Sequence, residues 1–157
     1  MRIGVMSDTH GDIAIAEKVI REMENLDLII HLGDHYEDGI KLKDKIKIPL
    51  IGIRGNCDGY SSGEDEMVYQ VEGHKILLIH GHQYGVKSDL NRLYYRALEL
   101  ECDLVLYGHT HIPVSMTFGN VMILNPGSLS LPRGGSKPSY GIVDINGSEI
   151  YSYIIEL

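Results

Sequence analysis

Residues 4–12, GVMSDTHGD, join an apolar run to two side chains of types that bind metal ions. Asp8 and His10 are two positions apart, and in an extended segment such positions point to the same face. A carboxylate and an imidazole on one face can hold a cation, but they can equally form the ordinary polar end of a strand. The motif alone is weak, so its meaning depends on what the rest of the chain adds.

Four further apolar segments end in the same way, in Asp, Asn or His beside a glycine. These segments are IIHLGD (29–34), GIRGN (52–56), LLIHGH (77–82) and VLYGHTH (105–111). In open α/β sheets, ligands bind at the carboxyl ends of the strands, so we expect these polar side chains to meet in one place. The resulting candidates for metal ligands are Asp8, His10, Asp34, Asn56, His80, His109 and His111. Oxygen and nitrogen donors suit Mn, Fe, Zn or Co, and seven are enough for two ions that share a carboxylate.

The composition is that of an acidic globular domain. The chain has 157 residues, of which 43% are hydrophobic and 23% charged, and its net charge is -8. We therefore expect a single domain over residues 1–157 and no stable binding to nucleic acid, which needs an excess of Lys and Arg. No apolar run approaches the length of a membrane span, so we expect no membrane association. Two cysteines and no recognisable export signal favour a cytoplasmic location.

The hydrophobic pattern predicts an α/β fold. Strands are expected at 2–7, 26–34 and 49–56, with a helix at 12–25 capped by Asp12 and a polar helix around 41–45. The second half begins with a hairpin over 66–82 that turns at 72–73. A helix at 88–101, with Leu93, Ala97 and Leu98 inward, and a strand at 102–111 follow it. Hairpins around FGN (118–120) and ING (145–147) complete the chain. This order predicts two packed sheets with outer helices.

The motifs D-x-H, G-D, G-N, H-G-H and G-H-T-H, in this order from Asp8 to His111, resemble the calcineurin-like metallophosphoesterase superfamily. The segments NPGSLSLPRGG (125–135) and PSYG (138–141) are similar to its small YfcE-like phosphodiesterase branch. The resemblance implies a two-sheet β sandwich flanked by helices, with a dimetal site at one edge. It also implies that Asp34 bridges two ions. The first ion would be held by Asp8, His10 and His111, and the second by Asn56, His80 and His109.

The resemblance implies a metal-dependent phosphodiesterase, in which a hydroxide activated by two divalent ions attacks a small phosphodiester. Manganese is the first expectation for the metal, with zinc, iron, nickel and cobalt as alternatives. Two other functions stay open: a phosphomonoesterase acting on a small metabolite, and a non-catalytic interaction scaffold of the same fold. A scaffold would be free to lose ligands, and all seven are present here. The oligomeric state is open, and a homo-oligomer is compatible with the sequence.

Three residues are candidate catalytic residues expected to contact the substrate: Asn56, Cys57 and His82. Many superfamily members have G-N-H-[D/E], whose His is thought to protonate the leaving oxygen or hold the phosphate, whereas this chain has GNCD at 55–58. A thiol is mostly protonated at neutral pH but bridges to oxygen less well than an imidazolium. His82 follows His80 by two positions and is expected to support the site or to contact phosphate.

Three further polar residues have simpler interpretations. His31 is expected to face the core or a backbone partner. Arg54 and Arg133 either contact phosphate or serve as surface and packing residues.

Overall fold

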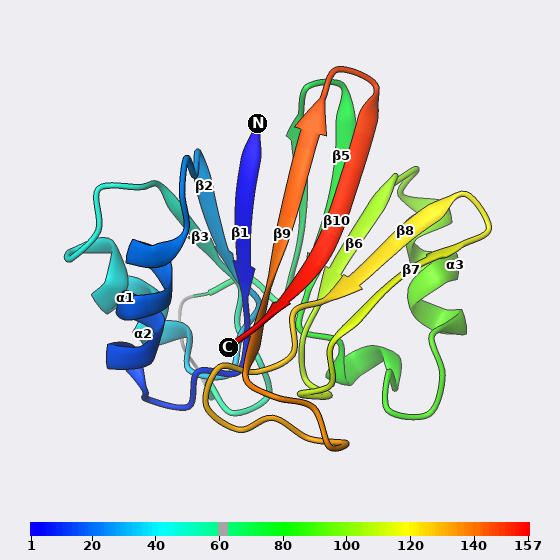
Figure 1. Cartoon of the computed structure of the whole chain (residues 1–157). Coiled ribbons are helices and arrows are strands. Elements are labelled where there is room, and N and C mark those ends of the chain that lie inside the picture. The colour runs from blue at the N-terminus through cyan, green and yellow to red at the C-terminus, as the bar shows by residue number, and fades with distance from the viewer. Residues whose placement is uncertain (60–62) are drawn as a thin grey trace.

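The computed structural model, which describes residues 1–59 and 63–157, contains two five-stranded sheets with helices on the outer faces (Figure 1). The first sheet has the order β10 (Glu149–Glu156), β9 (Ser139–Asn146), β1 (Arg2–Met6), β2 (Leu28–His31) and β3 (Leu50–Gly52). The second has the order β4 (Glu66–Val71), β5 (His74–Ile79), β6 (Leu104–Tyr107), β8 (Val121–Asn125) and β7 (Val114–Phe118). The helices are α1 (Ile13–Glu22), α2 (Tyr36–Lys43), α3 (Asn91–Glu99) and the 3-10 helix η1 (His82–Tyr84). The predicted two-sheet fold with flanking helices is confirmed.

The central strands are buried on both faces. Side chains alternate along a strand, and Ile3 of β1 and Leu106 of β6 belong to the core between the two sheets. The opposite face of each sheet packs on helices. Ile29 of β2 belongs to a hydrophobic cluster with buried residues of α1, and Val105 of β6 belongs to a cluster with buried residues of α3. The result is four layers, in the order helix, sheet, sheet, helix. None of the helices in the described residues is long and apolar enough to cross a membrane.

The carboxyl ends of the parallel strands from both sheets meet at the lower edge of Figure 1. Several hydrogen bonds join the sheets there, among them the following two. The backbone N–H of His109, after β6, donates to Asp8 Oδ2, after β1, at 3.1 Å. His80 Nδ1, after β5, lies 2.7 Å from the carbonyl oxygen of Leu32, after β2. Loops from both sheets are therefore fixed against one another at this edge.

Three details of the helices differ from the sequence prediction. Asp12 caps α1 as predicted, its Oδ1 accepting from the N–H of Ile15 at 3.1 Å, but the helix ends at Glu22 instead of 25. The helix predicted around 41–45 already begins at Tyr36, whose N–H donates to Asp58 Oδ1 at 2.7 Å. The inward position predicted for Leu98 is wrong: its side chain is 39% exposed. Each helical residue is rotated by about 100° from its neighbour, so Leu98 turns outward after the buried Ala97.

Candidate metal centre

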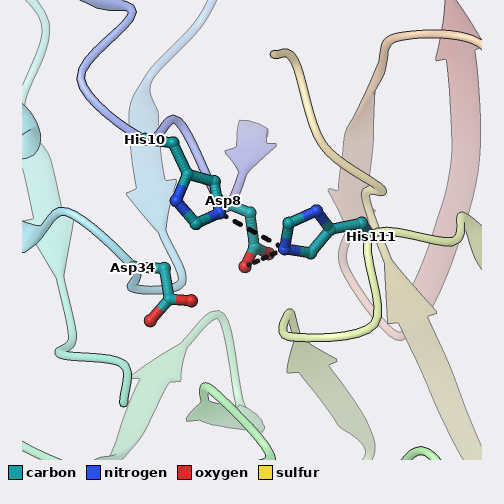
Figure 2. Close-up of side chains that lie close together, drawn as sticks. All are labelled: Asp8, His10, Asp34 and His111. Carbon is teal, nitrogen blue, oxygen red and sulfur yellow. Dashed lines mark hydrogen bonds and ion pairs between the residues drawn. The ribbon is translucent and has the colours of Figure 1, made fainter. Parts of the chain in front are cut away.

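The strand ends bring donor atoms from both sheets together. The first donor group consists of Asp8, His10, Asp34 and His111, and the second donor group consists of Asp34, His80 and His109. Within each group the ligand atoms lie within 4.8 Å of one another. Figure 2 shows Asp8, His10 and His111 pointing toward one spot, with Asp34 on the other side of it. Because Asp34 belongs to both groups, the geometry suits two ions that share one carboxylate.

The seventh candidate lies beside the second donor group. Asn56 Oδ1 is 3.2 Å from His80 Nε2. All seven residues predicted from the strand ends therefore lie at one edge of the sandwich, although they come from five separate segments.

Two backbone carbonyls fix the orientation of two histidines. His80 Nδ1 is 2.7 Å from the oxygen of Leu32, and His111 Nδ1 is 2.6 Å from the oxygen of Leu131. A carbonyl oxygen only accepts hydrogen bonds, so both Nδ1 atoms carry a proton and a neutral ring presents a lone pair at Nε2. This is the usual arrangement by which a second partner orients a metal-binding histidine.

Both of these Nε2 atoms lie close to carboxylate oxygens. His111 Nε2 lies 3.1 Å from Asp8 Oδ1 and 3.3 Å from His10 Nε2 (Figure 2), and His80 Nε2 lies 3.4 Å from Asp34 Oδ1. A ring lone pair and a carboxylate oxygen repel unless a proton or a cation lies between them. The arrangement therefore requires either protonated histidines or bound cations.

Asp8 supplies an independent test of the fit to a metal. Its side chain is fully buried, and its Oδ2 accepts from Ser7 Oγ at 2.5 Å and from the N–H of His109 at 3.1 Å. Its Oδ1 is also buried and lies 3.1 Å from His111 Nε2, a contact that becomes a hydrogen bond only when that nitrogen carries a proton. A buried carboxylate oxygen without a partner is costly. A divalent cation in the first donor group would satisfy it, so the residues present fit a metal.

The charges of the site are strongly coupled. Burial raises the pKa of Asp34, but hydrogen bonding and the charge of His80 outweigh this and hold the pKa well below its ordinary value. Burial also opposes protonation of His80, yet the neighbouring Asp34 and Asp8 raise its pKa. The hydrogen bond with Asp8 is the main cause that raises the pKa of His111. In the absence of metal, the two aspartates therefore favour protonation of these two histidines.

His109 behaves differently from these two histidines. Burial is the main cause that lowers the pKa of His109 to about 4, and the charges of His80 and Lys87 lower it further. Its ring is therefore neutral at physiological pH. A neutral imidazole is the form that binds metal ions.

Glycines permit this close assembly at two positions. A Cβ atom on Gly55 would overlap the Asp34 carboxylate and lie 2.9 Å from His80 Cε1. One on Gly108 would overlap Ser7 Oγ and lie 3.0 Å from Asp8 Oδ2. The glycines that precede Asn56 and His109 in the sequence therefore let backbone approach the two aspartates directly.

Five of the seven candidates have left-handed backbone conformations. Their φ angles are 54° at Asp8, 46° at His10, 51° at Asp34, 68° at His109 and 59° at His111. Residues other than glycine rarely adopt positive φ, although Asp and His tolerate it better than most. Such conformations gather at functional sites, where the surrounding structure imposes them.

A buried hydrogen-bond network that sequence reasoning missed lies under the first donor group. The N–H of Gly33 donates to His31 Nδ1 at 3.3 Å, so Nε2 carries the proton of the neutral ring and donates to Thr9 Oγ1 at 3.0 Å. Thr9 Oγ1 donates to Asp38 Oδ2 at 2.8 Å, and the N–H of Gly11 donates to the same oxygen at 2.8 Å. The network ties the loop that carries Asp8 and His10 to the loop that carries Asp34.

The position of His31 agrees with its expected contact to the backbone. Burial is the main cause that lowers its pKa to about 4, which keeps the ring neutral. Thr9 and Asp38 gave little signal in the sequence. Thr9 stands between two stronger candidates, and Asp38 lies in a polar helix without a clear hydrophobic period.

The predicted substrate-contact residues lie around the second donor group. The N–H of Cys57 donates to Asp34 Oδ1 at 2.9 Å, and burial together with Asp34 raises the thiol pKa to about 11. The thiol is thus protonated at neutral pH. The ring of His82 is centred 5.6 Å from that of His80 and 6.0 Å from that of His109. Its Nδ1 is buried and has no hydrogen-bond partner within the described residues.

The two candidate arginines lie in different surroundings. Arg54 forms a two-pronged ion pair with Asp65, with Nε–Oδ1 and Nη2–Oδ2 distances of 2.5 and 2.8 Å. Arg133 lies close to His111, to whose carbonyl oxygen its own N–H donates at 3.1 Å.

Known proteins share this sequence pattern and this fold. Residues 1–148 match the calcineurin-like phosphoesterase superfamily domain. The probable metallophosphoesterase YsnB of Bacillus subtilis is 34% identical over 146 residues, which cover 92% of this chain and 85% of YsnB. The phosphodiesterase YfcE of Escherichia coli is 29% identical over 171 residues, covering 92% of this chain and 88% of YfcE. The crystal structure of a predicted phosphoesterase from Streptococcus pneumoniae superposes with a TM-score of 0.85 at 33% identity, covering 99% of this chain and 88% of that one.

Proposed function

The chain belongs to the calcineurin-like phosphoesterase superfamily, and from this premise we propose that it is a phosphodiesterase that requires two divalent metal ions. The observation that carries the proposal is the pair of donor groups that share Asp34. The similarity to a relative named as a phosphodiesterase supports the choice of a diester.

The two ions are assigned by proximity and by the family resemblance. Asp8, His10 and His111 would hold one ion, and Asn56, His80 and His109 would hold the other. Asp34 would contact both. Two divalent ions bring four positive charges and the two aspartates remove two, so the site attracts phosphate although the chain as a whole is acidic.

When bound, the ions would supply a deprotonated water as nucleophile and neutralise charge that develops on the phosphoryl oxygens. The chain's own residues orient this chemistry. The carbonyl oxygens of Leu32 and Leu131 hold the two ring tautomers in place. The protonated thiol of Cys57 can donate a hydrogen bond to a substrate oxygen, and His82 lies where it can contact the phosphate.

A diester is favoured over a monoester by the charges near the donor groups. A phosphate monoester carries a second negative charge and needs an acid to protonate a poor leaving group. Position 57 offers a neutral thiol instead of an imidazolium, and Arg54 is held by Asp65. These features suit a singly charged diester with a leaving group that departs without strong acid assistance.

The test uses metal-stripped protein with bis-p-nitrophenyl phosphate, p-nitrophenyl phosphate and cyclic nucleotides, with Mn, Zn, Fe, Ni and Co added back separately. We expect hydrolysis of the chromogenic diester with Mn²⁺, and little of the monoester. Faster hydrolysis of the monoester would replace the proposal by the phosphatase alternative. Full metal occupancy without hydrolysis of any substrate would favour the scaffold alternative.

A further inference from the structure

A cleft of about 480 Å³ lies next to the donor groups, between the loop that precedes α3 and the segment that follows β6. Its floor is apolar and includes Leu90, Tyr107 and Val114. Lys87 and Arg133 contribute positive charge to its walls. Its size and its apolar floor with few polar groups are typical of sites for small organic groups.

The cleft lies beside the metal centre, since the charges of Lys87 and Arg133 act on the candidate ligands His109 and His111. Thr110, which lines it, stands in the chain between the candidate ligands His109 and His111. Arg133 is fixed beside the first donor group by the hydrogen bond from its N–H to the oxygen of His111, at 3.1 Å. A phosphoryl group bound at the donor groups can therefore extend one of its substituents toward the cleft.

The charged side chains of the cleft favour an anionic ligand. Within the described residues, neither Lys87 nor Arg133 forms an ion pair, whereas Arg54 and Arg96 are each held by a carboxylate at 2.5–2.6 Å. Asp89 also lines the cleft, where its Oδ1 accepts from the N–H of Asn91 at 2.9 Å. Its negative charge offsets one of the two cations, so the charged side chains of the cleft sum to +1. A net positive charge above an apolar floor complements a ligand that is apolar and negatively charged at once.

We infer that this cleft is a specificity subsite for one ester substituent of the substrate, and that it selects an aromatic or similarly flat apolar group that carries an anion. The inference rests on the proposed phosphodiesterase function. The metal centre would bind the phosphodiester itself, the apolar floor would bury the flat group, and the two cations would bind its anion.

The first test compares two diesters, p-nitrophenyl phenyl phosphate and its para-carboxyphenyl counterpart. Both release nitrophenolate, so a difference in kcat/KM reports on the retained substituent. We expect the wild-type protein to prefer the carboxylate by about tenfold at low salt. The double variant Lys87→Glu/Arg133→Glu is expected to lose or reverse this preference. The double variant Lys41→Glu/Lys43→Glu, at two exposed positions of α2, is the charge-matched control and should keep it.

The second test measures binding without catalysis. The anionic dye anilinonaphthalene sulfonate is titrated into metal-free protein, and its affinity is followed by fluorescence and by the methyl resonances of Val86, Leu90 and Val114. We expect shifts at these methyl groups and binding that is about tenfold weaker in the double variant.

The two tests separate the inference from the proposed function. Hydrolysis of both diesters with the same ratio in the wild type and the double variant would overturn the subsite and leave the diesterase intact. Absence of diester hydrolysis would overturn the diesterase, and the dye would then decide on the cleft. Dye binding that leaves the three methyl resonances unmoved would overturn the inference.

Discussion

The two ends of the sandwich turn the chain in different ways. At the hairpins β4–β5, β7–β8 and β9–β10, glycine adopts a positive φ angle each time, 85° at Gly73, 61° at Gly119 and 62° at Gly147, and Glu72 joins Gly73 with 50°. At the opposite edge, where the parallel strands end, glycines such as Gly33 and Gly81 also have positive φ, but so do five Asp and His residues of the two donor groups. Glycine adopts positive φ without steric cost, whereas each Asp or His costs on the order of 1 kcal/mol.

The difference shows which turns serve the fold and which serve the site. A hairpin needs only a change of direction, so a residue without a side chain suffices. The carboxyl edge needs the change of direction and a ligand at the same position, and glycine offers no ligand. The structure therefore accepts strain there, and it holds the strained loops with the network of Thr9, His31 and Asp38.

The largest effect is expected where the donor groups meet. Asp34→Asn removes the negative charge that both ions would share, and we expect it to lower turnover of a chromogenic diester by more than the roughly 10–100-fold typical of outer-shell changes. His82→Ala, at the margin of the site, should cost less. Turnover and metal content of both variants check this order. A metal-replete, active Asp34→Asn protein would remove Asp34 from its bridging role.

The next effect tests the network that holds the strained loops. Thr9→Val keeps the shape of the side chain but removes the hydroxyl between His31 and Asp38. We expect metal affinity to fall by about 10–100-fold, because the Asp8–His10 loop loses its link to the Asp34 loop. Affinity is measured by competition with a chelator, with Thr117→Val on the exposed face of β7 as the control. Equal affinities in the two variants would show that the network only supports folding.

The pH dependence of stability tests whether protons or metal ions lie between the histidine rings and the aspartates of the site. The raised pKa values of His80 and His111 stabilise the metal-free fold below about pH 6.5, and this contribution is lost as the pH rises through the folded values. Metal competes with the same protons. The lowered pKa values of His31 and His109 act in the opposite direction, so the effect of His80 and His111 is isolated by comparing protein with and without metal. We expect added Mn²⁺ to raise the melting temperature more at about pH 8 than at about pH 6, because fewer protons on His80 and His111 then compete with it. A metal-induced shift that is the same at both pH values would contradict this.

A smaller effect is expected when a left-handed residue is exchanged in a loop of the metal centre and in a hairpin turn. His10→Gly removes a left-handed side chain, so the metal-free variant should be at least as stable as the wild type. Gly147→Ala introduces such a strain where a Cβ has free space, and should cost about 1 kcal/mol. Denaturant unfolding without metal measures both. If His10→Gly is the more destabilised variant, side-chain packing outweighs backbone strain at the site.

The smallest effect is expected at Cys57. Nitrophenolate leaves without protonation, so Cys57→Ala should hydrolyse nitrophenyl diesters at a rate close to that of the wild type. With poorer leaving groups general acid catalysis is typically worth about 10²–10⁴-fold, and Cys57→His should favour these selectively. The slopes of log rate against leaving-group pKa are compared for the three proteins. Equal slopes would assign Cys57 to packing beside Asn56.

Much of the metal centre was predictable because its signals are local. Each strand end places its Asp, Asn or His directly after an apolar run and beside a glycine. Because the strands are parallel, their carboxyl ends lie at the same edge, which brings these side chains together. The hairpin turns were equally predictable from the short motifs around 72–73, 118–120 and 145–147, which the structure confirms.

What could not be predicted depends on contacts between distant segments. The start of α2 is set by Asp58, which lies 22 residues after Tyr36. Thr9 donates to Asp38, 29 residues further along the chain, and neither local sequence contains a pattern that predicts this contact. The cleft beside the site likewise requires residues 86–90 and 133 to meet. Such features arise from packing and leave no periodic pattern.

The position of β1 has a consequence for biosynthesis. Its partner on one side, β2, follows within 30 residues, but its partner on the other side is β9, and Arg2 is paired with Asp144. A ribosome adds roughly 5–20 residues per second, so the second edge of β1 waits for several seconds with unpaired backbone groups. An exposed apolar strand edge of this kind is prone to association with other chains. That edge of β1 therefore stays unpaired until β9 has emerged, and Asp8 and His111 come together only after most of the chain has been made.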